Sequence, residues 1–135
     1  MRRLFADTGY WIALTFPRDA LHASAVAQAA NAKSIPIVTT EMVLTEYLDG
    51  AAELGPHIRQ RAHLFVTDLR KLAQVQIIPQ SAELFQRAMD LYAARPDKEW
   101  TLTDCSSFVI CQDLEIVEAL AHDHHFSQAG FILLL

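Results

Sequence analysis

The stretch Trp100-Thr-Leu-Thr-Asp104-Cys-Ser-Ser-Phe108 decides how this chain folds, because it carries the signals that start a helix. Thr101 and Thr103 are both good N-cap residues, and apolar residues from Phe108 onward recur at helical spacing. The sequence therefore predicts a helix that begins near Asp104. Counting along this helix places the Asp104 carboxylate on the same face as the apolar residues.

A second acidic stretch, Leu120-Ala-His-Asp123-His-His-Phe126, follows that helix. The short, mostly apolar run Val117–Ala121 predicts a buried strand, and Asp123 comes just past its C-terminal end. Open α/β sheets bind their ligands at this edge. A purely structural interpretation stays open for both carboxylates, because Asp104 also fits a capping box with Thr101 and Asp123 suits a turn.

Length and composition indicate a compact globular chain. The chain has 135 residues, of which 52% are hydrophobic and 20% charged, with only 4 Gly and 5 Pro. A chain of this size buries roughly two-thirds of its surface on folding, so we expect one domain over residues 1–135. Asp7 interrupts the basic start of the chain, and no apolar run is as long as a membrane span. We therefore expect neither a signal peptide nor a membrane segment.

Cysteine placement and net charge bear on the cellular compartment and on the classes of partner. Cys105 and Cys111 lie on one predicted helix and point in different directions, which disfavours a disulfide and indicates a cytoplasmic protein. The net charge of −5 argues against broad attraction to nucleic acids or membranes. It does not exclude a nucleic-acid enzyme, because a bound metal can reverse the local field.

Strands and helices alternate along the rest of the chain. Pro17, Pro56 and Pro96 mark helix boundaries, while Thr40 and Ser81 suit helix N-caps. Strands are predicted over residues 3–6, 35–39, 75–79, 117–121 and 131–135, and helices over residues 10–16, 21–31, 41–50, 56–73, 82–92 and 104–114. This alternation predicts an α/β fold with a four- to five-stranded, mostly parallel sheet and helices on both faces.

Glu46 has two interpretations on the helix predicted over residues 41–50. It follows Met42 and Val43 at helical spacing, which places it on the inward side. Glu is seldom buried unless it is paired or binds a metal. Alternatively, Glu46 lies at the edge of the apolar stripe and its carboxylate reaches water.

Four carboxylates can converge at the C-terminal edge of such a sheet. Carboxylates held close together repel each other unless cations neutralise them. An all-oxygen acidic pocket suits Mg²⁺ or Mn²⁺, which can activate a water for phosphoryl displacement. The acidic residues predicted at this edge are Asp7, Glu46, Asp104 and Asp123.

These residues closely resemble the PIN-domain nucleases, and most closely the VapC toxins of bacterial and archaeal toxin–antitoxin pairs. Each motif alone is weakly specific, but four acidic positions in the right order and with their expected neighbours are a specific signal. The resembling segments span the chain and are Phe5-Ala-Asp7-Thr-Gly-Tyr-Trp-Ile-Ala-Leu14, Thr45-Glu46, Leu102-Thr-Asp104-Cys-Ser-Ser-Phe108 and Asp123-His-His-Phe-Ser-Gln-Ala-Gly-Phe131.

The resemblance implies a three-layer α/β/α PIN-like domain that hydrolyses RNA phosphodiester bonds with Mg²⁺ or Mn²⁺. It implies that Thr8 and Thr103 orient the carboxylates, whereas Gly9 stands where many members carry Ser or Asn. It also implies a homodimer, and a small antitoxin protein that blocks the active site with a basic side chain. The implied catalytic and metal-binding set is Asp7, Glu46, Asp104 and Asp123.

Within that set, Asp7, Asp104 and Asp123 would hold the metal. Glu46 would complete the shell of ligands or help to deprotonate the attacking water, which leaves a 5′-phosphate and a 3′-hydroxyl. Basic side chains that could meet RNA phosphates, or be solvated surface charges, are Arg2, Arg3, Arg95 and Lys98.

Two other classes of protein share parts of this pattern. Asp7-Thr8-Gly9 is also the signature of aspartic proteases, whose fold is nearly all strand. A non-catalytic binding module could keep the fold and use the helix over residues 56–73 as an interface, but it would have no reason to bear four repelling carboxylates.

Other reactive residues have simpler interpretations. The run His122-Asp123-His124-His125 could suggest zinc, but adjacent His side chains seldom reach one metal, so a surface turn with one His near the substrate is expected. Cys105 next to Asp104 is interpreted as a packing residue. Trp11 and Trp100 are interpreted as core residues, although either could stack on a base.

Overall fold

A five-stranded parallel sheet forms the centre of the molecule. The computed structural model describes residues 1–135, and the strand order is β3-β2-β1-β4-β5 with every neighbouring pair parallel. The predicted sheet is confirmed, and it is parallel throughout. The strands are β1 (Leu4–Ala6), β2 (Ile37–Thr40), β3 (Val75–Ile78), β4 (Glu118–Leu120) and β5 (Ile132–Leu133).

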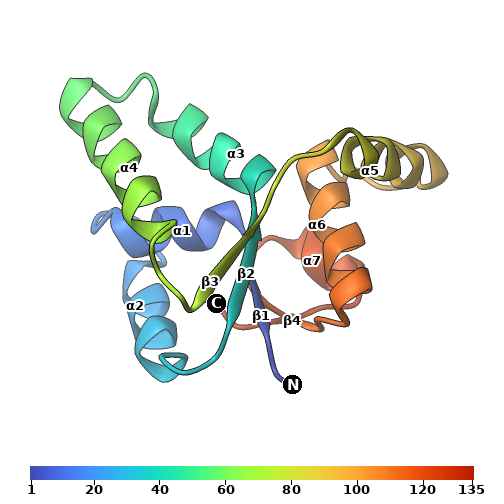
Figure 1. Ribbon diagram of the computed structural model, residues 1–135, viewed down its shortest axis with the longest axis horizontal. Helices are drawn as coiled ribbons and strands as arrows, with labels where there is room; N and C mark the ends of the chain where they lie inside the picture. The colour runs from blue at the N-terminus through green and yellow to red at the C-terminus, as the bar shows by residue number, and fades with distance from the viewer.

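Helices cover both faces of this sheet, which confirms the three-layer α/β/α prediction. In Figure 1, α1, α2 and α4 lie on one side of the strands, and α5, α6 and α7 lie on the other. No helix combines the length and the apolar character needed to cross a membrane. The helices are α1 (Thr8–Thr15), α2 (His22–Asn31), α3 (Glu41–Ala51), α4 (Pro56–Leu69), α5 (Ala82–Ala94), α6 (Leu102–Leu114) and α7 (His124–Gln128).

Local hydrogen bonds explain where most helices start. The Thr40 hydroxyl accepts a hydrogen bond from the Val43 N–H at 3.1 Å, and Ser81 caps α5 in the same way. Helix α2 has no side-chain cap; before it, the Asp19 carboxylate accepts a hydrogen bond from the Leu21 N–H and closes a turn.

Helix α6 begins two residues before Asp104, because Thr101 and not Thr103 is its N-cap. Helix α7 replaces the turn expected after Asp123. Sequence periodicity cannot detect a helix this short, since it completes little more than one turn.

Large aromatic side chains pack on both faces of the sheet around β1. All of β1 is buried, and Phe5 stacks on Phe126 of α7 at 6.1 Å between ring centroids. On the opposite face Trp11 is 2% exposed and donates its indole N–H to the Thr39 hydroxyl. The expectation that Trp11 packs in the core is therefore correct.

The order of the strands defines where a ligand can bind. From β1 the chain goes outward through β2 and β3, and later returns to place β4 on the other side of β1. Ala6 of β1 is in register with Leu120 of β4, so both strands end at the same level. A ligand site is expected at this point, where the direction of strand addition reverses.

The aspartic-protease alternative is wrong for this fold. The residues Asp7-Thr8-Gly9 lead directly from β1 into α1 of an α/β domain. A protease with this signature needs a fold built almost entirely of strands.

Candidate active site

Asp7 lies at the centre of the site, at the end of the central strand. Its backbone N–H donates to the Leu120 carbonyl at 3.2 Å, which ties the end of β1 to the end of β4. The residue occupies the N-cap position of α1, but its side chain makes no capping hydrogen bond. Asp7 is only 7% exposed, so its carboxylate is buried without a hydrogen-bonded side-chain partner.

Asp104 lies in the first turn of α6 and belongs to a complete capping box. The Thr101 hydroxyl accepts from the Asp104 N–H at 3.1 Å, and Asp104 Oδ2 accepts from the Thr101 N–H at 3.0 Å. Oδ1 of Asp104 has no hydrogen-bond partner in the protein. The capping interpretation is thus correct for one oxygen and leaves the other available for a ligand.

Glu46 reaches the site from α3 through a hydrogen bond. Glu46 is an exposed residue, and its Oε1 accepts from the Thr8 hydroxyl at 2.5 Å. The carboxylate therefore lies at the rim, oriented by Thr8 but open to water. Thr103 lines a cavity of about 400 Å³ together with Glu46, but its hydroxyl makes no hydrogen bond to a carboxylate.

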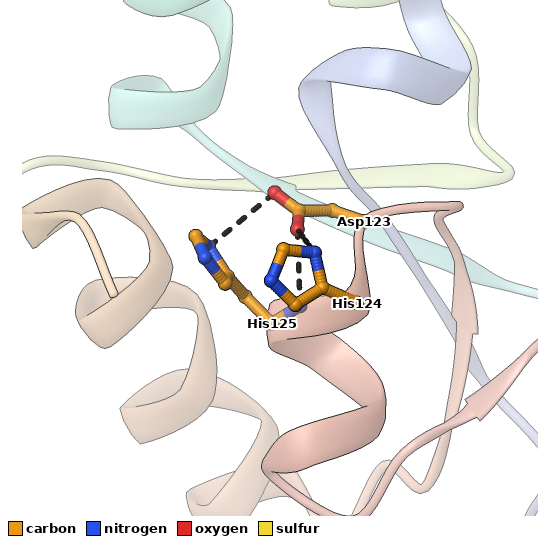
Figure 2. Close-up of side chains that lie close together, drawn as sticks. All are labelled: Asp123, His124 and His125. Carbon is orange, nitrogen blue, oxygen red and sulfur yellow. Dashed lines mark hydrogen bonds and ion pairs between the residues drawn. The ribbon is translucent and has the colours of Figure 1, made fainter. Parts of the chain in front are cut away.

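Asp123 follows β4, which pairs with β1 on the side opposite β2. It is the N-cap of α7, and its Oδ1 accepts from the His125 N–H at 3.0 Å. Its side chain is 39% exposed. Figure 2 shows the rings of His124 and His125 next to each other on one side of this carboxylate, with a dashed line from each ring to one of its oxygens.

The negative charges of three other carboxylates act on Asp7. The pKa of Asp7 is raised from 3.8 to about 7, mainly by burial and in smaller part by the negative charges of Asp104, Glu46 and Asp123, while a backbone hydrogen bond from Thr8 lowers it. Carboxylates as far as 116 positions along the sequence from Asp7 thus act on its carboxyl group. A cation placed among them would relieve both the burial and the repulsion.

The donor set fits a hard divalent cation. Asp7, Asp104 and Asp123 offer carboxylate oxygens at the end of the sheet, and Glu46 offers more at the rim. Oxygen ligands of this kind suit Mg²⁺ and Mn²⁺, which retain several waters when bound to a few carboxylates.

The sequence predicted one His of this run near the substrate but did not indicate that it is His125. Its ring Nδ1 lies 2.8 Å from Asp104 Oδ2, and its side chain is only 14% exposed. His124, in contrast, is 72% exposed. The one sequence signal for this difference is Phe126, whose burial turns the preceding residue of the short helix toward the site.

Cys105 is not an activated nucleophile. Burial, and then the negative charge of Asp104, raise the pKa of the Cys105 thiol above its ordinary value. The thiol therefore stays protonated at neutral pH, as expected for a packing residue.

The basic residues considered for RNA phosphates are already paired. Arg2 forms an ion pair with Glu118, and Arg95 and Lys98 both face Asp97. Arg3 donates to the Leu114 carbonyl. Arg95 also lies over the Trp100 ring, which is 7% exposed and packs in the core.

Comparison with known proteins identifies relatives of the whole chain. The family model described as PIN domain matches residues 4–132. The 23S rRNA-specific endonuclease VapC20 of Mycobacterium tuberculosis, in strains CDC 1551 / Oshkosh and H37Rv, is 28% identical over 129 residues, covering 96% of this chain and 95% of the relative.

A solved structure of that relative has the same fold. The crystal structure of M. tuberculosis VapC20, described as a sarcin–ricin loop cleaving toxin, is similar to this chain with a TM-score of 0.83. The identity is 28%, and the similarity covers 96% of each chain.

Proposed function

The chain belongs to the PIN-domain family and is an endoribonuclease of the VapC toxin type, and we propose that Asp7, Glu46, Asp104 and Asp123 form its catalytic centre. The observation that supports this proposal is the raised pKa of Asp7, which is buried at the end of the central strand and on which the charges of the other three carboxylates act. Repelling carboxylates would destabilise the fold for no purpose if the site bound nothing.

The proposed centre binds Mg²⁺ or Mn²⁺ through Asp7, Asp104 and Asp123. When bound, such a cation lowers the pKa of water and stabilises charge on phosphoryl oxygens. Asp104 would contribute Oδ1, because Oδ2 is engaged in the capping box. The Asp7 side chain makes no capping hydrogen bond, so its carboxylate would be available to the cation.

Glu46 is proposed to complete the set of ligands or to accept the proton of the attacking water. The Thr8 hydroxyl binds Oε1, so Oε2 is free to accept that proton. The water attacks the phosphorus, the bond to the 3′ oxygen breaks, and that oxygen takes up a proton. The products are a 5′-phosphate and a 3′-hydroxyl end.

The substrate is RNA, and 23S rRNA is the first RNA to test because VapC20 is named for it. An antitoxin protein is the expected second partner, as for other toxins of this type. We propose that the antitoxin blocks the four carboxylates with a basic side chain, and that the toxin acts in the cytoplasm as a homodimer.

The test is cleavage of total bacterial RNA and of intact ribosomes by the purified protein, with Mg²⁺, with Mn²⁺ and with EDTA. Asp104→Asn is run in parallel, because the Asn side-chain oxygen can still accept from the Thr101 N–H and keep the capping box. We expect discrete fragments with 5′-phosphate ends, abolished by EDTA and reduced at least 100-fold in Asp104→Asn. Equal cleavage by both proteins would refute the site assignment. A folded wild type that binds no metal and cleaves no RNA would favour a non-catalytic binding module.

A further inference from the structure

His125 contacts two of the four carboxylates from a partly buried position. Its Nδ1 lies 2.8 Å from Asp104 Oδ2 and 3.5 Å from Asp123 Oδ2. Figure 2 shows the His125 ring directed at the Asp123 carboxylate from the start of α7.

Two neighbours hold the His125 ring in place. The backbone N–H of His125 donates to Asp123 Oδ1, which fixes the first turn of α7. The next residue, Phe126, is fully buried and packs edge-on against Phe108 of α6 at 5.0 Å between centroids. Because Phe108 lies one turn after Asp104 on α6, the same packing fixes the distance between His125 and Asp104.

The hydrogen bond to Asp104 determines which nitrogen of the His125 ring carries a hydrogen. An ionised carboxylate only accepts hydrogen bonds, so a ring nitrogen 2.8 Å from Asp104 Oδ2 must carry a hydrogen. This is true of the neutral Nδ1–H tautomer and of the charged ring alike. Nδ1 is then unavailable as a metal ligand.

Oδ2 of Asp104 therefore has two donors, the Thr101 N–H and the His125 Nδ1–H. Together they fix the rotation of the carboxylate about its last bond, which leaves Oδ1 facing away from both donors. A ligand oxygen held in this way costs less conformational entropy when it binds a cation.

We propose that His125 is a positioning residue that fixes the Asp104 carboxylate so that Oδ1 faces the cation. The proposal rests on the function proposed above for the same site. It assigns to the His124–His125 pair two different roles, since only His125 touches Asp104 and His124 is 72% exposed. It also differs from a zinc site made by Asp123 and the two histidines, whose potential ligand atoms all lie within 4.8 Å of one another.

The experiment compares His125→Ala, His125→Asn and His125→Gln with the wild type, and uses His124→Ala as the matched control. The Asn amide N–H₂ can occupy nearly the position of Nδ1, whereas the longer Gln side chain places its amide beyond it. Mn²⁺ affinity is measured by electron paramagnetic resonance titration in the absence of RNA. Thermal unfolding with EDTA shows whether each variant is folded.

We expect the Kd for Mn²⁺ to rise about 10- to 100-fold in His125→Ala and in His125→Gln. His125→Asn should recover most of the affinity, and His124→Ala should stay within about twofold of the wild type. If His125→Ala does not fold, the contrast between Asn and Gln still decides the question. Unchanged Mn²⁺ affinity in His125→Ala, or in His125→Gln where Ala is unfolded, would overturn the proposal.

A spectroscopic measurement separates positioning from direct ligation. Electron spin-echo modulation of bound Mn²⁺ detects a directly bound imidazole nitrogen, and we expect no such signal from His125. A nitrogen signal that disappears in His125→Ala would overturn the positioning role and make His125 a ligand. Loss of Mn²⁺ binding in Asp104→Asn but not in any His125 variant would refute only this proposal. A wild type that binds no Mn²⁺ would refute the metal site and this proposal together.

Discussion

The two oxygens of Asp104 have different surroundings, and this resolves its two interpretations. Oδ2 completes the capping box with Thr101 and faces His125, while Oδ1 has no protein partner. A residue that caps a helix can therefore also bind a ligand, because each carboxylate oxygen is used separately. Substitutions at this position have to separate the two roles, which is why Asn and not Ala is the informative change.

The raised pKa of Asp7 predicts an unusual dependence of stability on pH. In the unfolded chain Asp7 loses its proton near its ordinary value of 3.8, but in the folded protein it does so at about 7. Its contribution to stability is therefore complete below pH 3.8 and is lost as the pH rises through 7.

We expect the metal-free wild type to lose on the order of 2–4 kcal/mol relative to Asp7→Asn between pH 4 and pH 8. The Asn side chain stays neutral and so isolates this effect from carboxyls whose pKa is lowered, such as Asp97. Urea unfolding in EDTA at several pH values measures the difference. Parallel stability curves for the two proteins would contradict the prediction.

The hydrogen bond from Thr8 to Glu46 predicts a functional effect without a large loss of stability. Thr8→Val keeps the shape of the side chain but removes the hydroxyl that orients Glu46. We expect kcat to fall about tenfold, since partners that orient a metal-site carboxylate typically contribute 10- to 100-fold.

Thr67→Val is the matched control for this change. Its hydroxyl donates to the His63 carbonyl on α4 and is exposed. RNA cleavage rates of both variants provide the test. An unchanged rate in Thr8→Val would show that Glu46 is positioned by other contacts or is not needed.

At the scale of elements, α7 depends on one anchoring side chain. Helix α7 is too short to be stable by itself, and Phe126 is its only buried residue. Phe126 packs against Phe5, Phe108 and Phe131. The helix therefore holds Asp123 and His125 in place through tertiary packing.

Truncation of this anchor should destabilise the whole protein. We expect Phe126→Ala to lower the free energy of unfolding by about 3–5 kcal/mol. Tyr92→Ala is the control, because Tyr92 is 58% exposed and its loss should cost less than about 1 kcal/mol. Chemical denaturation measures both, and a loss of less than 1 kcal/mol in Phe126→Ala would show that α7 is held by other contacts.

At the scale of the whole molecule, apolar side chains remain exposed outside the proposed catalytic centre. Leu54, Leu64 and Leu72 are each at least half exposed on α4 or in the segments that flank it. A second copy of the chain could cover them. We therefore expect a homodimer with twice the mass of the 15.1 kDa chain in light-scattering measurements. A mass of one chain across the micromolar range would contradict this prediction.

The sequence by itself determined the fold class and most of the elements. Strand and helix periodicity, with caps such as Thr40 and Ser81 and a helix start at Pro56, predicted the α/β alternation correctly. These signals are local, so each can be read from a few neighbouring residues. The order of Asp7, Glu46, Asp104 and Asp123 was also enough to indicate the family, while their catalytic roles and the single-domain boundary stay predictions.

Only the tertiary structure decided how these side chains meet. The α7 helix and the inward turn of His125 follow from the burial of Phe126 against Phe5 and Phe108, which no local pattern reports. The hydrogen bond from Thr8 to Glu46 likewise joins residues on different helices. The pKa of Asp7 depends on burial and on charges brought together from across the chain, because both act through space and not along the sequence.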